Sequence, residues 1–232
     1  MPVEQVEVLP EEPVRPRVTL HFAQTLDGRI ATRTGSSRWI SGPAATRFAH
    51  ELRAGSDAVI IGSGTAIADD PQLTVRLVEG RQPIRVVLDA RARLSAGSKL
   101  VTDASAPTIH VTCTPDRSPM APHVEPWCLL PDPGGVGVDL DTLLARLAAR
   151  GVTQVLVEGG SCVITAFLKR RLVDRIIVTV APMILGQGIE AVGDLGIERL
   201  DQALRFSPAR VFSLGDDVLI ELVPRPSQEL SS

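Results

Sequence analysis

The sequence predicts a single α/β domain built on a mixed, mostly parallel central sheet flanked by helices. Short apolar runs such as DAVIIG and IRVVLD recur along the chain, and their nearly continuous apolar character is typical of strands covered on both faces. Segments with helical spacing of apolar residues separate several of these runs, as in parallel α/β folds. With 232 residues, 44% of them hydrophobic, and no internal repeat, the chain can bury one large core.

The first half of the domain is expected to contain four or five strands and one clear helix. Residues 17–24 (RVTLHFAQ) alternate in hydrophobicity and form the first expected strand. Residues 41–56 (SGPAATRFAHELRAGS) predict a helix, because Pro43 suits a first turn and Gly55 suits an end. Further strands are expected at residues 57–62, 84–89 and 107–112 and around Trp127.

The second half is also expected to alternate helices and strands, and it closes with a hairpin. Residues 139–151 (DLDTLLARLAARG) predict a helix with one leucine face, and residues 152–174 supply a strand and a helix. Residues 174–182 (DRIIVTVAP) predict another strand, and residues 209–222 (ARVFSLGDDVLIEL) predict two strands at an antiparallel edge. We expect a flexible arm at residues 1–16, the domain at 17–224 and a flexible tail at 225–232.

Composition and charge restrict the classes of function. The formal net charge of -3 and the pI near 5.8 argue against nucleic acid as a partner. No run of 18 or more apolar residues is present and the N-terminus does not resemble a secretory signal, so we expect a cytoplasmic protein without membrane contact. The three cysteines and four histidines lack the spacing of metal ligands, and no metal site is predicted.

The most informative stretch is a buried strand that runs into Glu158, Gly159 and Gly160 and then into a helix. A carboxylate at the end of such a strand must lie in a cleft, be paired or meet a ligand. The glycines leave the first N–H groups of the helix open to a phosphate or pyrophosphate, which the helix dipole favours. An ordinary tight turn that binds nothing is the alternative.

Two further segments are polar where an α/β sheet is expected to bind ligands. Residues 62–76 (GSGTAIADDPQLTVR) follow a predicted strand, but they form neither a Walker loop nor a G-x-G-x-x-G motif. A helix end followed by a proline turn explains residues 69–71 equally well. Residues 23–42 contain a turn signal and Trp39, which can equally be a hydrophobic plug. Ligands of open α/β sheets bind at the carboxyl ends of the strands, so these segments predict a site there.

Ordered blocks of the chain resemble the pyrimidine reductase family, the reductase domain of the riboflavin-biosynthesis deaminase–reductase enzymes. The blocks are TLDGRIA, GSSRWISG, HELRAGSDAVIIGSGTAIADDPQLTVR, PIRVVLDA, VLVEGG and LVDRIIVTVAPMILG. The resemblance implies a dihydrofolate reductase-like fold, NADPH as cofactor and a homodimer. It also implies reduction of the ribosylamino group of 5-amino-6-(5-phosphoribosylamino)uracil, or of its 2,5-diamino-pyrimidinone equivalent, to ribitylamino.

The resemblance also assigns roles to individual residues. It implies that Glu158 and Asp69 are catalytic, and it implies substrate contacts for Ser37, Arg53, Leu73, Arg76 and Glu158. It implies NADPH contacts for Ala23, Trp39, Thr65, Asp69, Gly159, Gly160, Ser161, Cys162, Val163, Ile164, Thr165 and Ala166. The two arginines are the natural phosphate ligands, because a guanidinium matches a phosphate with two parallel donors.

The chain departs from the family pattern at two positions. Bacterial bifunctional members often carry a lysine at the position of His21, and Ala90 stands where a serine can contact the cofactor, a role that Arg91 or Arg93 can take at the 2′-phosphate. No H-x-E followed by P-C-x-x-C is present, so a stand-alone reductase without deaminase activity is expected. Two alternatives stay open: a reductase of the same fold for another pterin, pyrimidine or specialised metabolite, and a nucleotide-binding module without catalysis.

Overall fold

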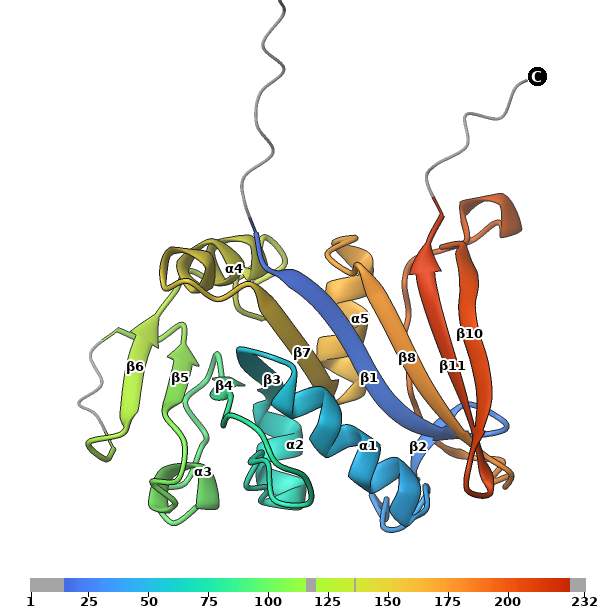
Figure 1. Ribbon diagram of the computed structural model, residues 1–232. Coiled ribbons are helices and arrows are strands. Elements are labelled where there is room, and N and C mark those ends of the chain that lie inside the picture. The colour runs from blue at the N-terminus through green and yellow to red at the C-terminus, as the bar shows by residue number, and fades with distance from the viewer. Residues whose placement is uncertain (1–14, 116–119, 136, 226–232) are drawn as a thin grey trace, which may run out of the picture.

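Strands and helices alternate along most of the computed structural model, which describes residues 15–115, 120–135 and 137–225 (Figure 1). The strands are β1 (Arg17–Thr25), β2 (Arg29–Thr32), β3 (Ala58–Gly62), β4 (Ile84–Leu88), β5 (Thr108–Thr112), β6 (Val124–Cys128), β7 (Gln154–Gly159), β8 (Arg175–Ala181), β9 (Gly188–Glu190), β10 (Phe206–Leu214) and β11 (Asp217–Pro224). The helices are α1 (Pro43–Ala54), α2 (Ser63–Asp69), α3 (Lys99–Thr102), α4 (Leu140–Ala149), α5 (Ser161–Lys169) and a 3-10 turn, η1 (Leu200–Gln202).

One large sheet organises these elements. Its strand order is β10-β11-β8-β1-β7-β3-β4-β5-β6. All neighbours from β8 to β6 pair in parallel, whereas β11 pairs antiparallel with β8 and β10 pairs antiparallel with β11. The predicted α/β fold, with a mostly parallel centre and an antiparallel edge, is therefore confirmed.

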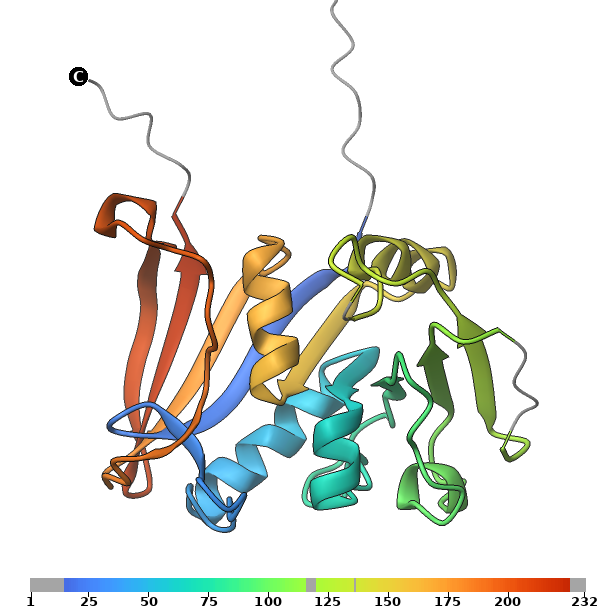
Figure 2. The same ribbon diagram turned by 180° about the vertical axis from the view of Figure 1, so that it is seen from behind.

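Helices cover both faces of this sheet. The alternation of side chains along each strand sends two apolar layers to opposite faces. One layer packs against α4 and α5, where Leu147 and Phe167 are 0% exposed. The other packs against Leu52 of α1, Ala66 of α2 and Leu100 of α3. Accordingly, α5 lies in front of the sheet in Figure 2, whereas α1 lies in front of it in Figure 1. Each large side chain buried in this way stabilises the fold by about 1.5–3 kcal/mol.

A buried arginine ties two loops to the sheet. Arg85 of β4 is 0% exposed, and its guanidinium donates to three carbonyl oxygens, those of Gln72 at 3.3 Å and of Asp103 and Ala106 at 2.6 Å each. Burial lowers the pKa of this guanidinium, and the charge of Asp103 opposes that effect. The three bonds satisfy donors of the buried guanidinium, and they hold the backbone at Gln72, Asp103 and Ala106 beside the sheet.

Several short elements are not predicted from the sequence. Residues 63–69 form α2, so the helix end that the sequence leaves open at residues 69–71 is present, but the helix itself is not among the predicted elements. The two-stranded sheet of β2 and β9 is also unforeseen. Elements of three to seven residues are too short to show a period, and β2 and β9 depend on contacts between distant parts of the chain. One such contact is the ion pair between Arg29 and Glu190, at 2.7 Å.

The packed part of the chain begins before residue 17. Arg15 donates to both carboxylate oxygens of Asp174, at 2.7 and 2.8 Å, and Pro16 is buried. These contacts involve two residues of the expected arm, while residues 1–14 of that arm and 226–232 of the expected tail lie outside the described residues. Among the helices that the structure describes, none is long and apolar enough to cross a membrane.

Candidate active site

The carboxyl ends of β3 and β7 are neighbours, and the helices that follow them touch at their first turns. A Cβ atom added to Gly62 would lie 2.8 Å from Cγ2 of Val163, and one added to Gly160 would lie 2.7 Å from Oγ1 of Thr65. Real Cβ atoms do not approach so closely, so a larger residue at either position would displace its neighbour. The starts of α2 and α5 are thus interlocked at the edge of the sheet where ligands bind in this fold class.

The turn into α5 leaves two backbone donors available. Gly160 has a φ of 80°, and its carbonyl accepts from the amides of Val163 and Ile164 at 3.0 and 3.1 Å. The amides of Ser161 and Cys162 have no acceptor in the part of the chain that is described. They lie at the positive end of a nine-residue helix. This cradle fits the phosphate or pyrophosphate that the sequence predicts there.

The carboxylate of Glu158 is held by an arginine from α1. Arg53 donates from Nε and Nη2 to the two oxygens of Glu158, at 2.6 and 2.7 Å, and from Nη1 to the carbonyl of Thr74 at 3.3 Å. The side chains of Arg53 and Glu158 are only 14% and 9% exposed. Burial by itself raises the pKa of Glu158, but the charge and hydrogen bonds of Arg53 outweigh it and the pKa falls below its usual range. Glu158 is therefore an ionised acceptor.

Two neutral histidines lie beside this ion pair. The Nδ1 atom of His50 accepts from the amide of Arg76 at 2.9 Å, and burial, followed by the charges of Arg53 and Arg76, lowers the pKa of His50 to about 4. His21 of β1 lies next to Glu158, since Leu20 and Val157 face each other in the two strands. Burial also lowers the pKa of His21, with the charge of Glu158 opposing it.

The predicted phosphate ligand Arg76 lies at the rim of this cluster. Its side chain is exposed, and its guanidinium donates to the hydroxyl and the carbonyl of Thr74. Arg53 and Arg76 both donate to the carbonyl of Thr74, so the two guanidinium groups are close. Burial and then the charge of Arg53 lower the pKa of Arg76. Two arginines in this position form a positively charged rim that suits a phosphate.

The predicted residues of the loop before α1 lie farther toward solvent. Trp39 is 77% exposed, and Ser37 is partly exposed. Arg38 donates to the carbonyl of Asp69 at 3.1 Å, so this loop is tied to the end of α2. No contact links the carboxylate of Asp69 to Glu158 within the described residues, and the catalytic role of Asp69 stays a prediction.

Several predicted ligand contacts are restricted to backbone atoms. The side chains of Leu73, Val163 and Ile164 are 3%, 9% and 0% exposed and belong to the core, so the ligand contacts predicted for them would involve backbone atoms. The hydroxyl of Thr165 donates to the carbonyl of Ser161 and accepts from the amide of Gly193, so it joins α5 to a neighbouring loop. Two predicted positions, Ala23 in β1 and Ala166 in α5, are half-buried.

Sequence reasoning misses several polar residues at this edge. They are His50, Thr74, Asp89 and His110. His50 lies three residues before Arg53, on the same side of α1, and this spacing is a signal that could have found it. The buried pair of Asp89 and His110, at 3.0 Å, joins two strands and has no local sequence signal.

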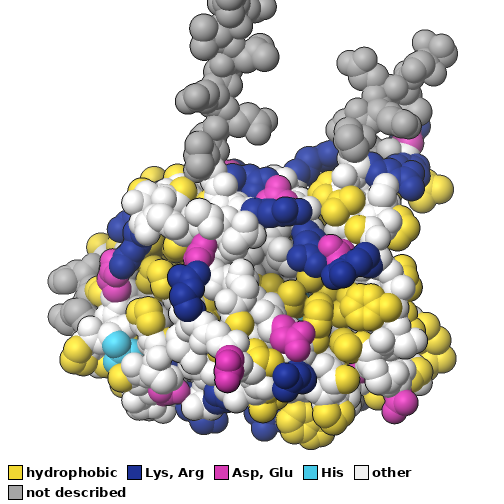
Figure 3. Space-filling view, in the orientation of Figure 1, with side chains coloured by type: hydrophobic (Ala, Val, Ile, Leu, Met, Phe, Trp, Pro, Cys, Tyr) yellow, Lys and Arg dark blue, Asp and Glu magenta, His cyan; other side chains and the backbone are white. Residues whose placement is uncertain are grey.

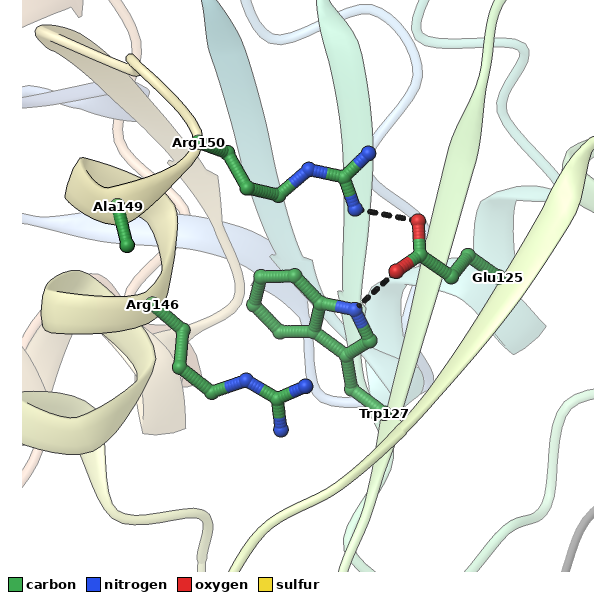
Figure 4. A pocket seen from close by; sticks show the side chains of 5 residues that line it. All are labelled: Glu125, Trp127, Arg146, Ala149 and Arg150. Carbon is green, nitrogen blue, oxygen red and sulfur yellow. Dashed lines mark hydrogen bonds and ion pairs between the residues drawn. The ribbon is translucent and has the colours of Figure 1, made fainter.

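A hollow of about 400 Å³ lies elsewhere, between β6 and α4 (Figure 4). The guanidinium of Arg146 lies 4.3 Å from the ring centroid of Trp127, while Glu125 accepts from the indole N–H at 2.7 Å and pairs with Arg150. These groups satisfy one another, and none of them is a predicted site residue. Within the described ranges, no group of three or more His, Cys, Asp or Glu side chains could hold a metal ion.

Comparison with known proteins identifies relatives over nearly the whole chain. The family model for the RibD C-terminal domain matches residues 16–220. The chain is 39% identical over 216 residues to the 2,5-diamino-6-ribosylamino-4(3H)-pyrimidinone 5′-phosphate reductase of Methanothermobacter thermautotrophicus, covering 90% of this chain and 98% of that protein. It is 38% identical over 210 residues to the riboflavin biosynthesis protein RibD of Aquifex aeolicus, covering 89% of this chain but 57% of that protein. The chain thus spans a little over half of that longer relative.

Solved structures give the same relationship. The structure of Acinetobacter baumannii RibD superimposes with a TM-score of 0.81 and 36% identity, covering 91% of this chain and 58% of that one. Dihydrofolate reductase from Enterococcus faecalis superimposes with a TM-score of 0.50 at 16% identity, over 90% of this chain and 97% of that one. At that identity the likeness concerns the fold alone, and it confirms the expected dihydrofolate reductase-like architecture.

Proposed function

This chain belongs to the RibD C-terminal domain family, and on that basis we propose that it is an NADPH-dependent reductase of riboflavin biosynthesis. The proposed reaction converts the ribosylamino group of 5-amino-6-(5-phosphoribosylamino)uracil, or of its 2,5-diamino-pyrimidinone equivalent, to ribitylamino. The observation that carries this proposal is the buried Arg53–Glu158 pair beside the glycine turn of α5. It places polar groups suited to a substrate next to backbone amides suited to a phosphate.

The substrate side of the cleft is suited to orient a phosphorylated aminopyrimidine. Glu158 is ionised, and each oxygen that accepts from Arg53 keeps a second lone pair for an N–H or O–H of the substrate. Arg76 has an exposed guanidinium for the phosphate, which Arg53 reinforces by its charge. Because the pKa of Glu158 is lowered, this residue acts as a fixed acceptor and not as a proton donor.

The cofactor side is suited to a dinucleotide. The free amides of Ser161 and Cys162 would hold the pyrophosphate. Because Gly160 has no Cβ, the pyrophosphate oxygens could approach the backbone there. NADPH supplies a hydride when bound, and the protein aligns it with the sugar carbon. In the substrate, the amine proton moves to the ring oxygen as the C1′–O bond breaks and an imine forms. Hydride then adds to C1′, and a proton from solvent adds to nitrogen.

Turnover with defined substrates tests this function. Purified protein should consume NADPH only when the ribosylaminopyrimidine phosphate is present, and mass spectrometry should find a product heavier by two hydrogens. Consumption with a pterin but not with the ribosylaminopyrimidine would favour the alternative reductase. NADPH binding without consumption in either case would favour a non-catalytic module and refute the proposal.

We also propose a homodimer that forms through β8, β11 and β10. Hydrophobic side chains gather over these strands in Figure 3, and Phe212 of β10 is 36% exposed there. Beside it, Glu221 pairs with Arg175 and Arg210 at 2.7 and 2.9 Å, which gives the patch a charged border. An apolar patch with a polar rim on the edge of a sheet is typical of an interface between identical chains.

We further propose a cytoplasmic location. The free cysteines, at positions 113, 128 and 162, agree with it.

A further inference from the structure

A buried carboxylate lies at the tip of the hairpin that β10 and β11 form. Asp217 is the first residue of β11 and pairs with Leu214 across a turn in which Gly215 has a φ of 68°. Only 4% of Asp217 is exposed, and its Oδ2 atom accepts from the amide of Gly42 at 2.8 Å. The two residues are 175 positions apart. The bond therefore fastens the antiparallel edge of the sheet to the segment that enters α1.

This contact supplies a group that α1 lacks. Gly42 is the N-cap residue of α1 and has no side chain that could bond to the helix, Pro43 has no N–H, and the first turn contains no acidic residue. The hairpin also packs here, because a Cβ atom added to Gly215 would lie 3.5 Å from Cβ of Ala44. A carboxylate is favoured at the positive end of a 12-residue helix. Asp217 thus fixes the point at which the chain passes into α1.

The loop that joins β2 to α1 has few other tethers. Trp39 is 77% exposed and Arg38 is exposed as well, so packing contributes little to the position of the loop. Within the described residues, two hydrogen bonds join the loop to distant parts of the chain. Arg38 donates to the carbonyl of Asp69 at 3.1 Å, and Gly42 donates to Asp217. The first bond is exposed to solvent, so the second is the firmer of the two.

We propose that Asp217 is a positioning residue: through its bond to Gly42 it holds the loop that carries Ser37 and Trp39, the predicted contacts of substrate and NADPH. The inference rests on the proposed function and adds a residue outside the cleft on which binding of both ligands depends. The far end of α1 is held separately by its buried ion pair with Glu158. Loss of Asp217 should therefore disturb the loop and leave that pair intact.

Steady-state kinetics of two substitutions test the positioning role. Asp217→Leu has a similar size but no acceptor for the amide of Gly42, whereas Asp217→Asn keeps an acceptor oxygen. In Asp217→Leu, KM should rise about tenfold for both NADPH and the ribosylaminopyrimidine, while kcat changes little, because contacts made equally in the ground state and the transition state affect KM alone. Asp217→Asn should restore both KM values to within about twofold of the wild type.

Asp57→Leu is the matched control. Asp57 is also a carboxylate that joins distant parts of the chain, since its Oδ2 atom accepts from the amides of Thr153 and Gln154 at 2.9 and 3.0 Å. It lies directly before β3, at the opposite edge of the sheet from the cleft. Asp57→Leu should lower the midpoint of urea unfolding without raising either KM.

Amide hydrogen exchange in the absence of ligands tests the loop directly. Peptides that cover residues 36–46 should exchange faster in Asp217→Leu than in the wild type, and at the wild-type rate in Asp217→Asn. Peptides around Glu158 should exchange alike in all three proteins. If Asp217→Leu does not fold, Asp217→Ser replaces it, because its shorter side chain leaves the amide of Gly42 unpaired.

Three results would overturn the inference. One is an unchanged KM for both ligands in Asp217→Leu, with or without faster exchange. Another is an equal rise of KM in Asp57→Leu, which would trace the effect to lost stability. The third is a KM in Asp217→Asn as high as in Asp217→Leu, because the bond to Gly42 would then not be the cause.

The outcome is separable from the proposed reaction, because hydrogen exchange and a fluorescence titration with NADPH need no turnover. A protein that reduces the ribosylaminopyrimidine equally well as wild type and as Asp217→Leu refutes only the positioning role. A wild type that reduces no ribosylaminopyrimidine, but loses NADPH affinity and loop protection in Asp217→Leu, refutes only the reaction.

Discussion

Removing the charge of Arg53 should destabilise the protein strongly and reverse the pH dependence that Glu158 gives to its stability. The side chains are 14% and 9% exposed, and two hydrogen bonds of 2.6 and 2.7 Å join them. Arg53→Met keeps the length of the side chain and leaves a buried carboxylate without its partner. Breaking a buried ion pair in this way costs about 3–5 kcal/mol. For a domain of this size, that corresponds to a fall in Tm of roughly 6–20 °C.

The sign of the pH effect follows from the pKa of Glu158. In the wild type this pKa is lowered, because Arg53 outweighs burial, so the pair contributes stability above the unfolded pKa of about 4.3 and loses it as pH falls through the folded value. In Arg53→Met, burial acts alone and raises the pKa. The penalty is then absent below about pH 4.3 and grows as pH rises toward the raised folded pKa. Acidification should therefore stabilise the variant.

Urea unfolding of four proteins measures both effects. The wild type, Arg53→Met, Glu158→Gln and the double variant are compared at several values between about pH 3 and 8, a range that covers both the acid loss of the wild type and the rising penalty of Arg53→Met. The double variant should be more stable than either single variant, because no unpaired charge is left. Single losses that add in the double variant to within about 0.5 kcal/mol would refute the coupling. A stability of Arg53→Met that does not change with pH would refute the pKa argument.

Three further predictions concern the other parts of the site. Gly160→Ala should weaken NADPH binding in a fluorescence titration, because its Cβ would lie 2.7 Å from Oγ1 of Thr65. Gly151→Ala, which has the same φ of 80° and nothing within 4 Å, should show the backbone strain without the binding loss. Arg76→Ala should lower kcat/KM about 10- to 150-fold for the phosphorylated substrate, with a much smaller loss for its dephosphorylated form. Phe212→Asp should convert the proposed dimer to a monomer in light scattering, and a wild type that is itself monomeric at micromolar concentration contradicts the interface.

Much of the fold is predictable from the sequence because its main elements are long or strongly apolar. The boundaries of α1 agree with the signals of Pro43 and Gly55, and the leucine face of α4 is buried as expected. What the sequence does not predict depends on distant contacts. β2 finds its partner β9 more than 150 residues later, and α2 shows a single turn of apolar spacing, with only Ala66 and Ser63 buried.

The site is predictable as a set of residues but not as a set of contacts. Glu158 and Arg53 each appear among the expected substrate ligands, yet the bond between them joins residues 105 positions apart and has no local signal. The substrate contact of Leu73 stays a prediction, and the burial of its side chain in the core, where it is 3% exposed, is a feature that the sequence does not reveal. The interlock of Gly160 with Thr65 depends on the adjacency of β3 and β7, which only the folded sheet creates.

Arg85 binds the loops that contain Gln72 and residues 103–106 through main-chain carbonyls. These three bonds therefore do not depend on which side chains the loops carry. The side chains of Gln72, Asp103 and Ala106 take no part in the three bonds. The charge of Asp103 favours the buried guanidinium, and its carboxylate accepts from Gln72 at 3.0 Å, so the anchor tolerates substitution at Gln72 and Ala106 better than at Asp103. Arg85 itself has no such freedom, because the single ammonium of a lysine cannot span donors as a planar guanidinium does. The segment that carries Arg76 toward the cleft can therefore diversify, in evolution or in a designed library, while its backbone stays fastened to the sheet.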